Sequence, residues 1–170
     1  RWIIAIGSLT PGMPHDCYAQ LAHAAQQKGA PLALDSSGAA RAAALEVGVA
    51  LVKPSLRELR DLLQRPLNTV QECGDAAFTL VQQGAASTVA VSMGEQGAVM
   101  ARRDGVWHAP ALAVPTTTGT TGAGDCFLAA LVWALERGDT PPEALRWGVA
   151  AGAAALLSPG TALAQAADIH

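Results

Sequence analysis

Two glycines lie just before an acidic residue in the segment Gly122–Asp125, at the start of a long apolar run. The residues that follow, Cys126–Leu135, contain no charged side chain and predict a buried helix that begins at or beside Asp125. Backbone N–H groups at such a helix start point outward and carry the positive end of the helix dipole, which suits a phosphate. A carboxylate in the same turn can take the proton of a hydroxyl that attacks this phosphate. The segment therefore predicts phosphoryl transfer with Asp125 as base, and the alternative is an aspartate that caps the helix after a glycine turn.

The composition is that of a globular protein without a nucleic-acid or membrane surface. The chain has 170 residues, of which 51% are hydrophobic and 15% charged, enough for one domain with a substantial core. Its net charge of −3 predicts neither a nucleic acid nor a membrane as partner, and no apolar run is long enough to span a bilayer. The 3 cysteines form no Cys-x-x-Cys pair, so we expect reduced thiols in a cytoplasmic protein rather than disulfides or a zinc site.

Strands alternate with helices through most of the sequence, which predicts a mostly parallel sheet with helices on both faces. Residues 98–102 and 106–109 flank the turn Arg103–Gly105 and predict an antiparallel hairpin at an edge of that sheet. Ser55 is followed three residues later by Glu58, which is the spacing of a capping box at a helix start. The predicted strands are 2–6, 31–35, 49–53, 88–92, 98–102 and 106–109, and the predicted helices are 18–27, 39–47, 55–63, 69–83, 126–137 and 141–157.

Four loops rich in glycine, serine or proline are predicted at strand ends or helix starts. Ligands of such sheets bind at the carboxyl ends of the strands, so we expect these loops to converge on one rim. Neither the Walker A pattern nor Gly-x-Gly-x-x-Gly occurs, which excludes an ordinary P-loop NTPase and an ordinary dinucleotide-binding domain. Each loop on its own is also compatible with ordinary turn chemistry. The four loops are 7–12, 53–55, 92–97 and 122–125.

The order of these loops resembles that of the PfkB carbohydrate kinases, also known as the ribokinase-like sugar kinases. The segment 122–125 is similar to the anion hole and catalytic aspartate of that family, and other segments are similar to its phosphofructokinase and tagatose-6-phosphate kinase branch. The resemblance covers nearly the whole chain and implies an α/β, ribokinase-like three-layer fold. It further implies that residues 1–170 are a single α/β domain, the C-terminal, nucleotide-binding part of a longer sugar kinase whose N-terminal part and lid are absent here. The other segments are 7–12, 34–38, 53–59, 92–98 and 148–161.

The resemblance implies ATP-dependent phosphoryl transfer to a hydroxyl of a sugar phosphate, of the 1-phosphofructokinase, 6-phosphofructokinase or tagatose-6-phosphate kinase type. Asp125 is then the base, Ser8 also faces the acceptor, and Glu58 acts on Mg²⁺ through water. The anion hole that holds charge on the transferred group is formed by Gly122, Ala123 and Gly124. The residues expected at ATP are Lys53, Ser55, Glu58, Ser92, Gly94, Gly97, Thr120, Thr121, Val149 and Ala153. A K⁺ ion is a further candidate, at Gly119, Thr121, Ala155, Ser158 and Gly160.

Ser55 stands where that family usually has asparagine, and its hydroxyl lacks the separate donor and acceptor of an amide. Two alternatives to a sugar-phosphate kinase therefore stay open: a kinase of another small acceptor, such as a sugar or a nucleoside, and a non-catalytic nucleotide-binding remnant. Catalysis needs an acceptor held in line and water excluded. The resemblance implies that the absent N-terminal part and lid do this, so we expect this segment alone to be inactive. An exposed sheet edge can pair with another chain, which makes a homodimer a further candidate.

Overall fold

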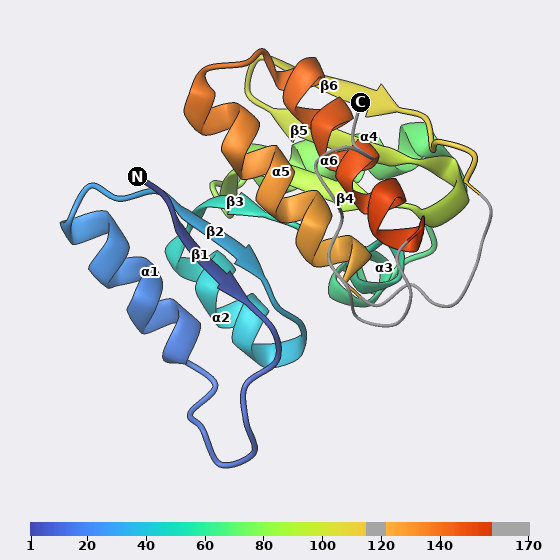
Figure 1. The fold of residues 1–170 in the computed structure, drawn as a ribbon. Helices are drawn as coiled ribbons and strands as arrows, with labels where there is room; N and C mark the ends of the chain where they lie inside the picture. The colour runs from blue at the N-terminus through green and yellow to red at the C-terminus, as the bar shows by residue number, and fades with distance from the viewer. Residues whose placement is uncertain (115–121, 158–170) are drawn as a thin grey trace. The chain divides into compact units, whose positions relative to one another are not determined.

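The structure, a computed structural model, describes residues 1–114 and 122–157 of the chain (Figure 1). It divides into two compact units, the first formed by Arg1–Val91 with Met100–Val106 and the second by Ser92–Val99 with Trp107–His170. The single domain expected from the sequence stays a prediction. None of the helices in the described ranges is both long and apolar enough to cross a membrane.

The strands form one sheet, and its six strands follow one another in chain order. The first four strands run parallel, each hydrogen-bonded to the next. The connections between the fourth, fifth and sixth strands are short. A parallel pair needs a crossover of a dozen or more residues, so these last strands run antiparallel to their neighbours. This mixed α/β sheet with an antiparallel edge confirms the predicted fold class. The strands are β1 (Ile3–Ile6), β2 (Leu32–Asp35), β3 (Val49–Val52), β4 (Ala86–Ser92), β5 (Ala98–Arg102) and β6 (Gly105–Ala109).

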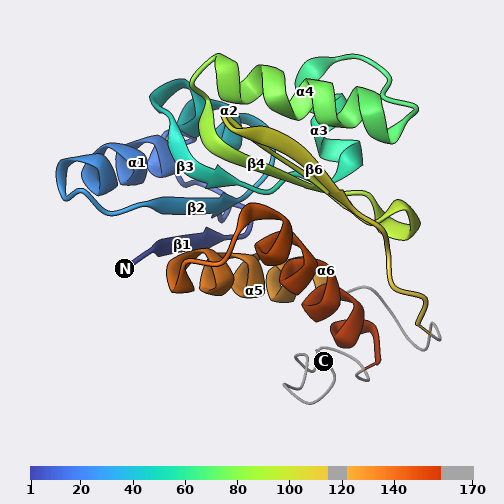
Figure 2. The same ribbon diagram turned by 90° about the horizontal axis from the view of Figure 1, so that it is seen from above.

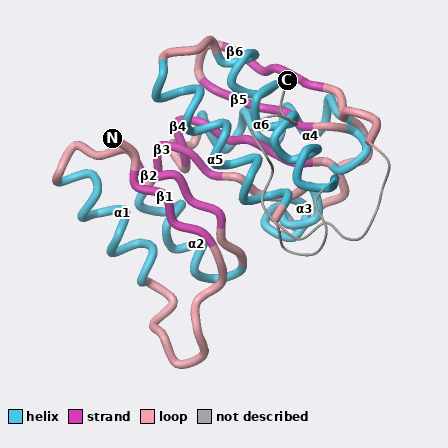
Figure 3. The backbone as a smooth tube through the Cα atoms, viewed as in Figure 1, coloured by secondary structure: helices cyan, strands magenta, loops and turns pink. Residues whose placement is uncertain are grey.

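The helices between the parallel strands lie on one face of this sheet (Figure 2). Because each parallel strand is added beside the preceding one in the same direction, right-handed crossovers place every connection on the same side. Figure 3 shows β1, β2 and β3 side by side, and α1 and α2 pack against each other. These helices are α1 (Cys17–Gln27), α2 (Gly38–Val47), α3 (Leu56–Leu63) and α4 (Val70–Gln82).

All six predicted strands are present, and the largest shift is at the start of β4. The sequence predicts a strand from Thr88, whereas β4 begins at Ala86. Alanine and serine have low strand propensity, so the pattern alone does not mark this start. Pairing of Val49 with Ala86 in the parallel ladder extends the strand by these residues.

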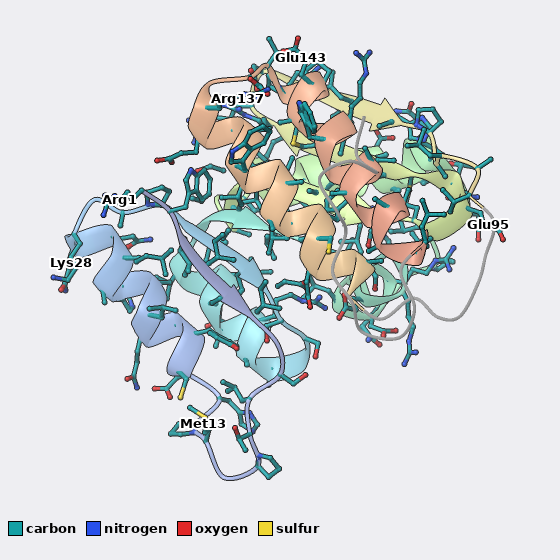
Figure 4. All side chains as sticks on the ribbon, in the orientation of Figure 1. Arg1, Met13, Lys28, Glu95, Arg137 and Glu143 are labelled. Carbon is teal, nitrogen blue, oxygen red and sulfur yellow. The ribbon has the colours of Figure 1, made fainter. Side chains whose placement is uncertain are left out.

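The second unit contains two long helices, α5 (Ala123–Arg137) and α6 (Pro141–Leu157), and the short 3₁₀ turn η1 (Gly94–Gln96). A Cβ added to Gly148 of α6 would lie 3.2 Å from the Phe127 ring of α5, so the glycine allows the two helices to approach closely. Figure 4 shows Arg137 and Glu143 at the turn that joins them. The Arg137 guanidinium lies 4.2 Å from the centre of the Trp133 ring.

Candidate functional site

The start of α5 presents open backbone donors. Gly122 precedes the helix with φ +85°, a left-handed conformation that favours glycine. The first helical hydrogen bond runs from the Cys126 N–H to the Gly122 carbonyl at 2.9 Å. The N–H groups of Ala123, Gly124 and Asp125 therefore have no acceptor inside the helix, and they point out of its positive end.

The Asp125 carboxylate is exposed and makes no hydrogen bond or ion pair with the described residues. Acidic residues at the same third position of other helices behave differently. Glu58 and Glu72 form capping boxes with the residues that precede α3 and α4. Glu143 accepts hydrogen bonds from the N–H and the hydroxyl of Thr140, which hold the pKa of its carboxyl below the usual value. Gly122 has no hydroxyl and makes no such bond with Asp125, so Asp125 does not form a capping box.

Close packing brings α6 beside this helix start. A Cβ on Gly152 would lie only 3.3 Å from the Ala123 carbonyl oxygen. Val149 lies three residues before Gly152 on the same face of α6. The structure thus places Gly152 beside the predicted anion hole within the second unit, and the roles of Val149 and Ala153 stay predictions.

The loop after β4 is a tight turn tied to the end of β6. The Met93 N–H donates to the Gly97 carbonyl at 2.8 Å, and the Gly97 N–H to the Gly94 carbonyl at 3.0 Å. Gly97 has φ +85°, and a Cβ there would lie 2.0 Å from the Ala109 carbonyl oxygen, so only glycine fits. The half-buried Ser92 ends β4 at the entrance to this loop. Ser92, Gly94 and Gly97 therefore form one compact loop, as the sequence predicts.

Lys53 lies directly after β3 and its side chain is 5% exposed. Its ammonium forms an ion pair of 2.9 Å with Asp35, the last residue of β2. Asp35 was not among the predicted site residues, although opposite charges at the ends of two neighbouring parallel strands could have indicated the pair. An ammonium has three N–H donors, so this ion pair leaves donors for another acceptor.

The predicted capping box at the start of α3 is confirmed. The Ser55 hydroxyl accepts from the Glu58 N–H at 3.3 Å and donates to Glu58 Oε2 at 3.0 Å, while the Ser55 N–H donates to the same oxygen at 2.8 Å. Glu58 Oε1 makes no hydrogen bond with the described residues. The fixed carboxylate thus keeps one oxygen available.

Sequence reasoning missed Arg41, whose side chain is 3% exposed. It lies in the alanine-rich helix α2, where a single arginine would be expected to point to solvent. Instead it donates to the Ser36 and Glu58 carbonyl oxygens, both at 3.1 Å, and lies 3.5 Å from Glu58 Oε2. A buried cation among carbonyl groups leaves no signal in a single sequence.

The remaining predicted residues are either apart from these groups or outside the described ranges. Ser8 is exposed in the loop after β1. This loop lies at the carboxyl ends of the parallel strands, where Asp35 ends β2. Ala155 is 4% exposed on α6. No cluster of three or more His, Cys, Asp or Glu side chains that could hold a metal occurs in the part of the chain that the structure describes. The predicted residues outside that part are Gly119, Thr120, Thr121, Ser158 and Gly160.

Comparison with known proteins agrees with the arrangement of these loops. Residues 2–167 match the pfkB family of carbohydrate kinases. The chain is 39% identical over 169 residues to ATP-dependent 6-phosphofructokinase isozyme 2 of Mycobacterium tuberculosis, covering 99% of this chain and 49% of that protein. It is 34% identical over 155 residues to 1-phosphofructokinase of Haemophilus influenzae, covering 91% of this chain and 49% of that protein. The chain therefore spans about half the length of these curated relatives.

Solved structures show the same similarity. Phosphofructokinase-2 from Escherichia coli in complex with potassium superposes with a TM-score of 0.91 at 38% identity, over 98% of this chain and 54% of that one. The same enzyme in complex with fructose-6-phosphate gives a TM-score of 0.88 at 36% identity, over 98% of this chain and 53% of that one. Family match, sequence identity and fold agree, and the chain belongs to the pfkB family of carbohydrate kinases.

Proposed function

We propose that this chain provides the nucleotide-binding and phosphoryl-transfer part of an ATP-dependent kinase that acts on a hydroxyl of a sugar phosphate. The observation that carries the proposal is the exposed Asp125 carboxylate, unpaired among the described residues, beside the open N–H groups of α5. Three other acidic residues at the same helix position, Glu58, Glu72 and Glu143, are used as caps. An uncapped carboxylate beside an anion-binding helix start suits a base next to a phosphate.

In this mechanism Asp125 accepts the proton of the acceptor hydroxyl as its oxygen attacks the γ-phosphorus of ATP. The bond from phosphorus to the β,γ-bridging oxygen breaks, and ADP leaves with that oxygen. The N–H groups of Ala123 and Gly124 and the positive end of the α5 dipole stabilise the negative charge on the transferred group. Positioning and electrostatic stabilisation account for most of the rate in phosphoryl transfer, and these groups would contribute to the electrostatic part.

ATP is expected to lie along the loops already described. The loop Ser92–Gly97 and Lys53 bind its phosphates or ribose, and Val149 and Ala153 border its base. Mg²⁺ usually binds to one or two carboxylates together with substrate phosphates and water, and the open Oε1 of Glu58 fits this preference. Mg²⁺ would neutralise charge on the phosphates. The K⁺ prediction rests on positions of which only Ala155 is described, and is supported by the potassium complex of the Escherichia coli relative.

The acceptor class is supported by the relatives and not by residues of this chain alone. The relatives are 6-phosphofructokinases and 1-phosphofructokinases, and one solved relative holds fructose-6-phosphate. A fructose phosphate is therefore the proposed acceptor, with tagatose 6-phosphate as a further candidate and Ser8 on its side of the site. One relative has a tetrameric inhibited form, and a homodimer is our expectation for this protein.

Replacing the base tests this proposal in the protein expressed from its complete gene. Asp125→Asn removes the proton acceptor but keeps the shape of the side chain. We therefore expect turnover to fall about 10²- to 10⁴-fold, with the affinity for ATP nearly unchanged. Asp104→Asn is the matched control, because Asp104 is an exposed aspartate in the β5–β6 turn and is not among the predicted site residues. Equal turnover in Asp125→Asn and the control would contradict the assignment.

A further inference from the structure

The buried guanidinium of Arg41 joins three elements of the first unit. It hydrogen-bonds the Ser36 carbonyl directly after β2 and the Glu58 carbonyl in the first turn of α3, both at 3.1 Å, while Arg41 itself belongs to α2. Its Nη1 also lies 3.5 Å from Glu58 Oε2. A planar guanidinium offers five donors in a rigid fork, so it can fix the relative positions of these groups in a way a flexible ammonium cannot.

The contacts at Glu58 fix one carboxylate oxygen and leave the other open. Oε2 receives the Ser55 N–H at 2.8 Å, the Ser55 hydroxyl at 3.0 Å and the charge of Arg41. Oε1 receives no hydrogen bond from the described residues, and the Glu58 side chain is 29% exposed. The carboxylate is therefore oriented with its open oxygen available to a hydrated cation.

An arginine at this core position has a high free-energy cost if stability is its only role. Its Nε and the Oγ of Ser36 are both buried without a hydrogen-bond partner in the described structure. Buried ion pairs often stabilise less than apolar side chains of the same volume, so stability alone does not explain an arginine here. Groups that orient a metal-binding carboxylate, in contrast, commonly change metal affinity strongly when they are removed.

We propose that Arg41 is a positioning residue that orients Glu58 toward the Mg²⁺ of a bound Mg²⁺–nucleotide complex. This inference rests on the proposed function, because it requires that the site bind a nucleotide with Mg²⁺. It adds Arg41 of α2, which lies outside every predicted loop, to the residues proposed to control metal binding.

The test is binding calorimetry with a non-hydrolysable ATP analogue, with saturating Mg²⁺ and with excess EDTA, in the protein expressed from its complete gene. We expect Arg41→Met to lower the affinity for the Mg²⁺ complex about tenfold and to leave the affinity for the metal-free analogue unchanged. The thermal midpoint should fall as well, because the Ser36 and Glu58 carbonyl oxygens lose their donor and Glu58 loses its cationic partner. Arg57→Met is the matched control, because Arg57 is a neighbouring arginine whose side chain is 90% exposed.

Equal losses for both forms of the analogue, or a fall in thermal midpoint with no change in Mg²⁺ preference, would show that Arg41 is only structural. If Arg41→Met does not fold, Arg41→Lys keeps the charge and loses the fork, and it should show the same selective loss. Glu58→Gln separates the proposed function from the proposed role of Arg41. If the wild-type protein binds neither the Mg²⁺ complex nor the metal-free analogue, the proposed function fails. If Glu58→Gln loses the preference for the Mg²⁺ complex and both Arg41 variants keep it, only the role of Arg41 fails.

Discussion

Asp125 differs from the other acidic residues at helix starts because its neighbours leave it unpaired. A serine or threonine before α3, α4 and α6 engages the acid three residues later, whereas Gly122 before α5 has no side chain to offer. The same position on a helix thus serves as a cap in three cases and carries an unpaired carboxylate among the described residues in the fourth. The missing hydroxyl at Gly122 accounts for part of this difference.

Gly97 is the residue for which a single methyl group has the clearest expected cost. In Gly97→Ala the new Cβ would lie 2.0 Å from the Ala109 carbonyl oxygen at φ +85°, so the end of β6 must move. We expect a loss of about 3 kcal/mol in the free energy of unfolding, together with weaker ATP binding. Gly94→Ala is the control, since it adds a methyl group in open space at φ +58° and should cost about 1 kcal/mol. Urea unfolding measures both, and equal costs would contradict the proposed clash.

Some site residues could be predicted from the sequence and others could not. Glycine turns and the spacing of Ser55 and Glu58 are local patterns, so the sequence predicts the turns and the capping box, while the roles of these residues stay predictions. The partners of Lys53 and Glu58 lie far away in the sequence, at Asp35 and Arg41, and only the fold brings them together. Charges that meet in this way are specified by tertiary structure and not by periodicity.

At the scale of elements, the sequence predicts nearly everything because strand and helix patterns are strong. The buried strands β2 and β3 are short apolar runs ended by a polar residue, and α5 and α6 are long and apolar. Most boundaries shift by at most two residues, as at the start of β4, and α5 begins at Ala123, three residues before the predicted start at residue 126. The hydrophobic pattern does not show that α1 and α2 share one face of the sheet. This follows from the right-handedness of the crossover connections between parallel strands.

The two capping boxes of α3 and α4 allow stability and function to be separated. Ser55→Ala and Thr69→Ala each remove a side-chain cap with the same pattern of bonds, so each should cost about 1 kcal/mol of stability. Only Ser55 donates to the carboxylate proposed to act on Mg²⁺, so only Ser55→Ala should weaken binding of the Mg²⁺–nucleotide complex. Thermal unfolding and calorimetry provide the two readouts. Equal effects of both variants on nucleotide binding would contradict a metal role for Glu58.

At the scale of the whole molecule, the buried thiol of Cys73 links stability to pH. Burial raises the pKa of this thiol from 9.0 to about 11, an effect only partly offset by the charge of Arg60. The pKa of the thiol is higher in the folded than in the unfolded state. The protonated thiol therefore contributes fully to the free energy of unfolding below about pH 9, and this contribution is lost as pH rises toward 11. The loss approaches about 3 kcal/mol.

Cys73→Ala should flatten this part of the pH profile, because alanine does not titrate. Urea unfolding of both proteins between pH 8 and pH 11 provides the measurement, and the difference between the two profiles cancels the contribution of all other groups. Parallel profiles across the range from the unfolded-state pKa of 9.0 to about 11 would contradict the raised pKa.

Acceptor recognition is the part of the function that these residues predict least. The chain aligns with about half of each relative, and Ser8 is the only predicted acceptor contact besides Asp125. Nucleotide contacts, in contrast, are spread over loops whose turns and glycines are visible in the sequence. The proposal is therefore sharper for the reaction type than for the sugar.

The most direct test of a sugar-phosphate kinase is to follow the phosphorus itself. The protein expressed from its complete gene is incubated with ATP, Mg²⁺ and, separately, fructose 6-phosphate, fructose 1-phosphate, tagatose 6-phosphate, unphosphorylated fructose or a nucleoside, and ³¹P NMR is recorded. We predict a new phosphomonoester signal, with equimolar ADP, for at least one of the sugar phosphates. A new ester only with fructose or the nucleoside, or nucleotide binding with no transfer to any acceptor, would contradict the account.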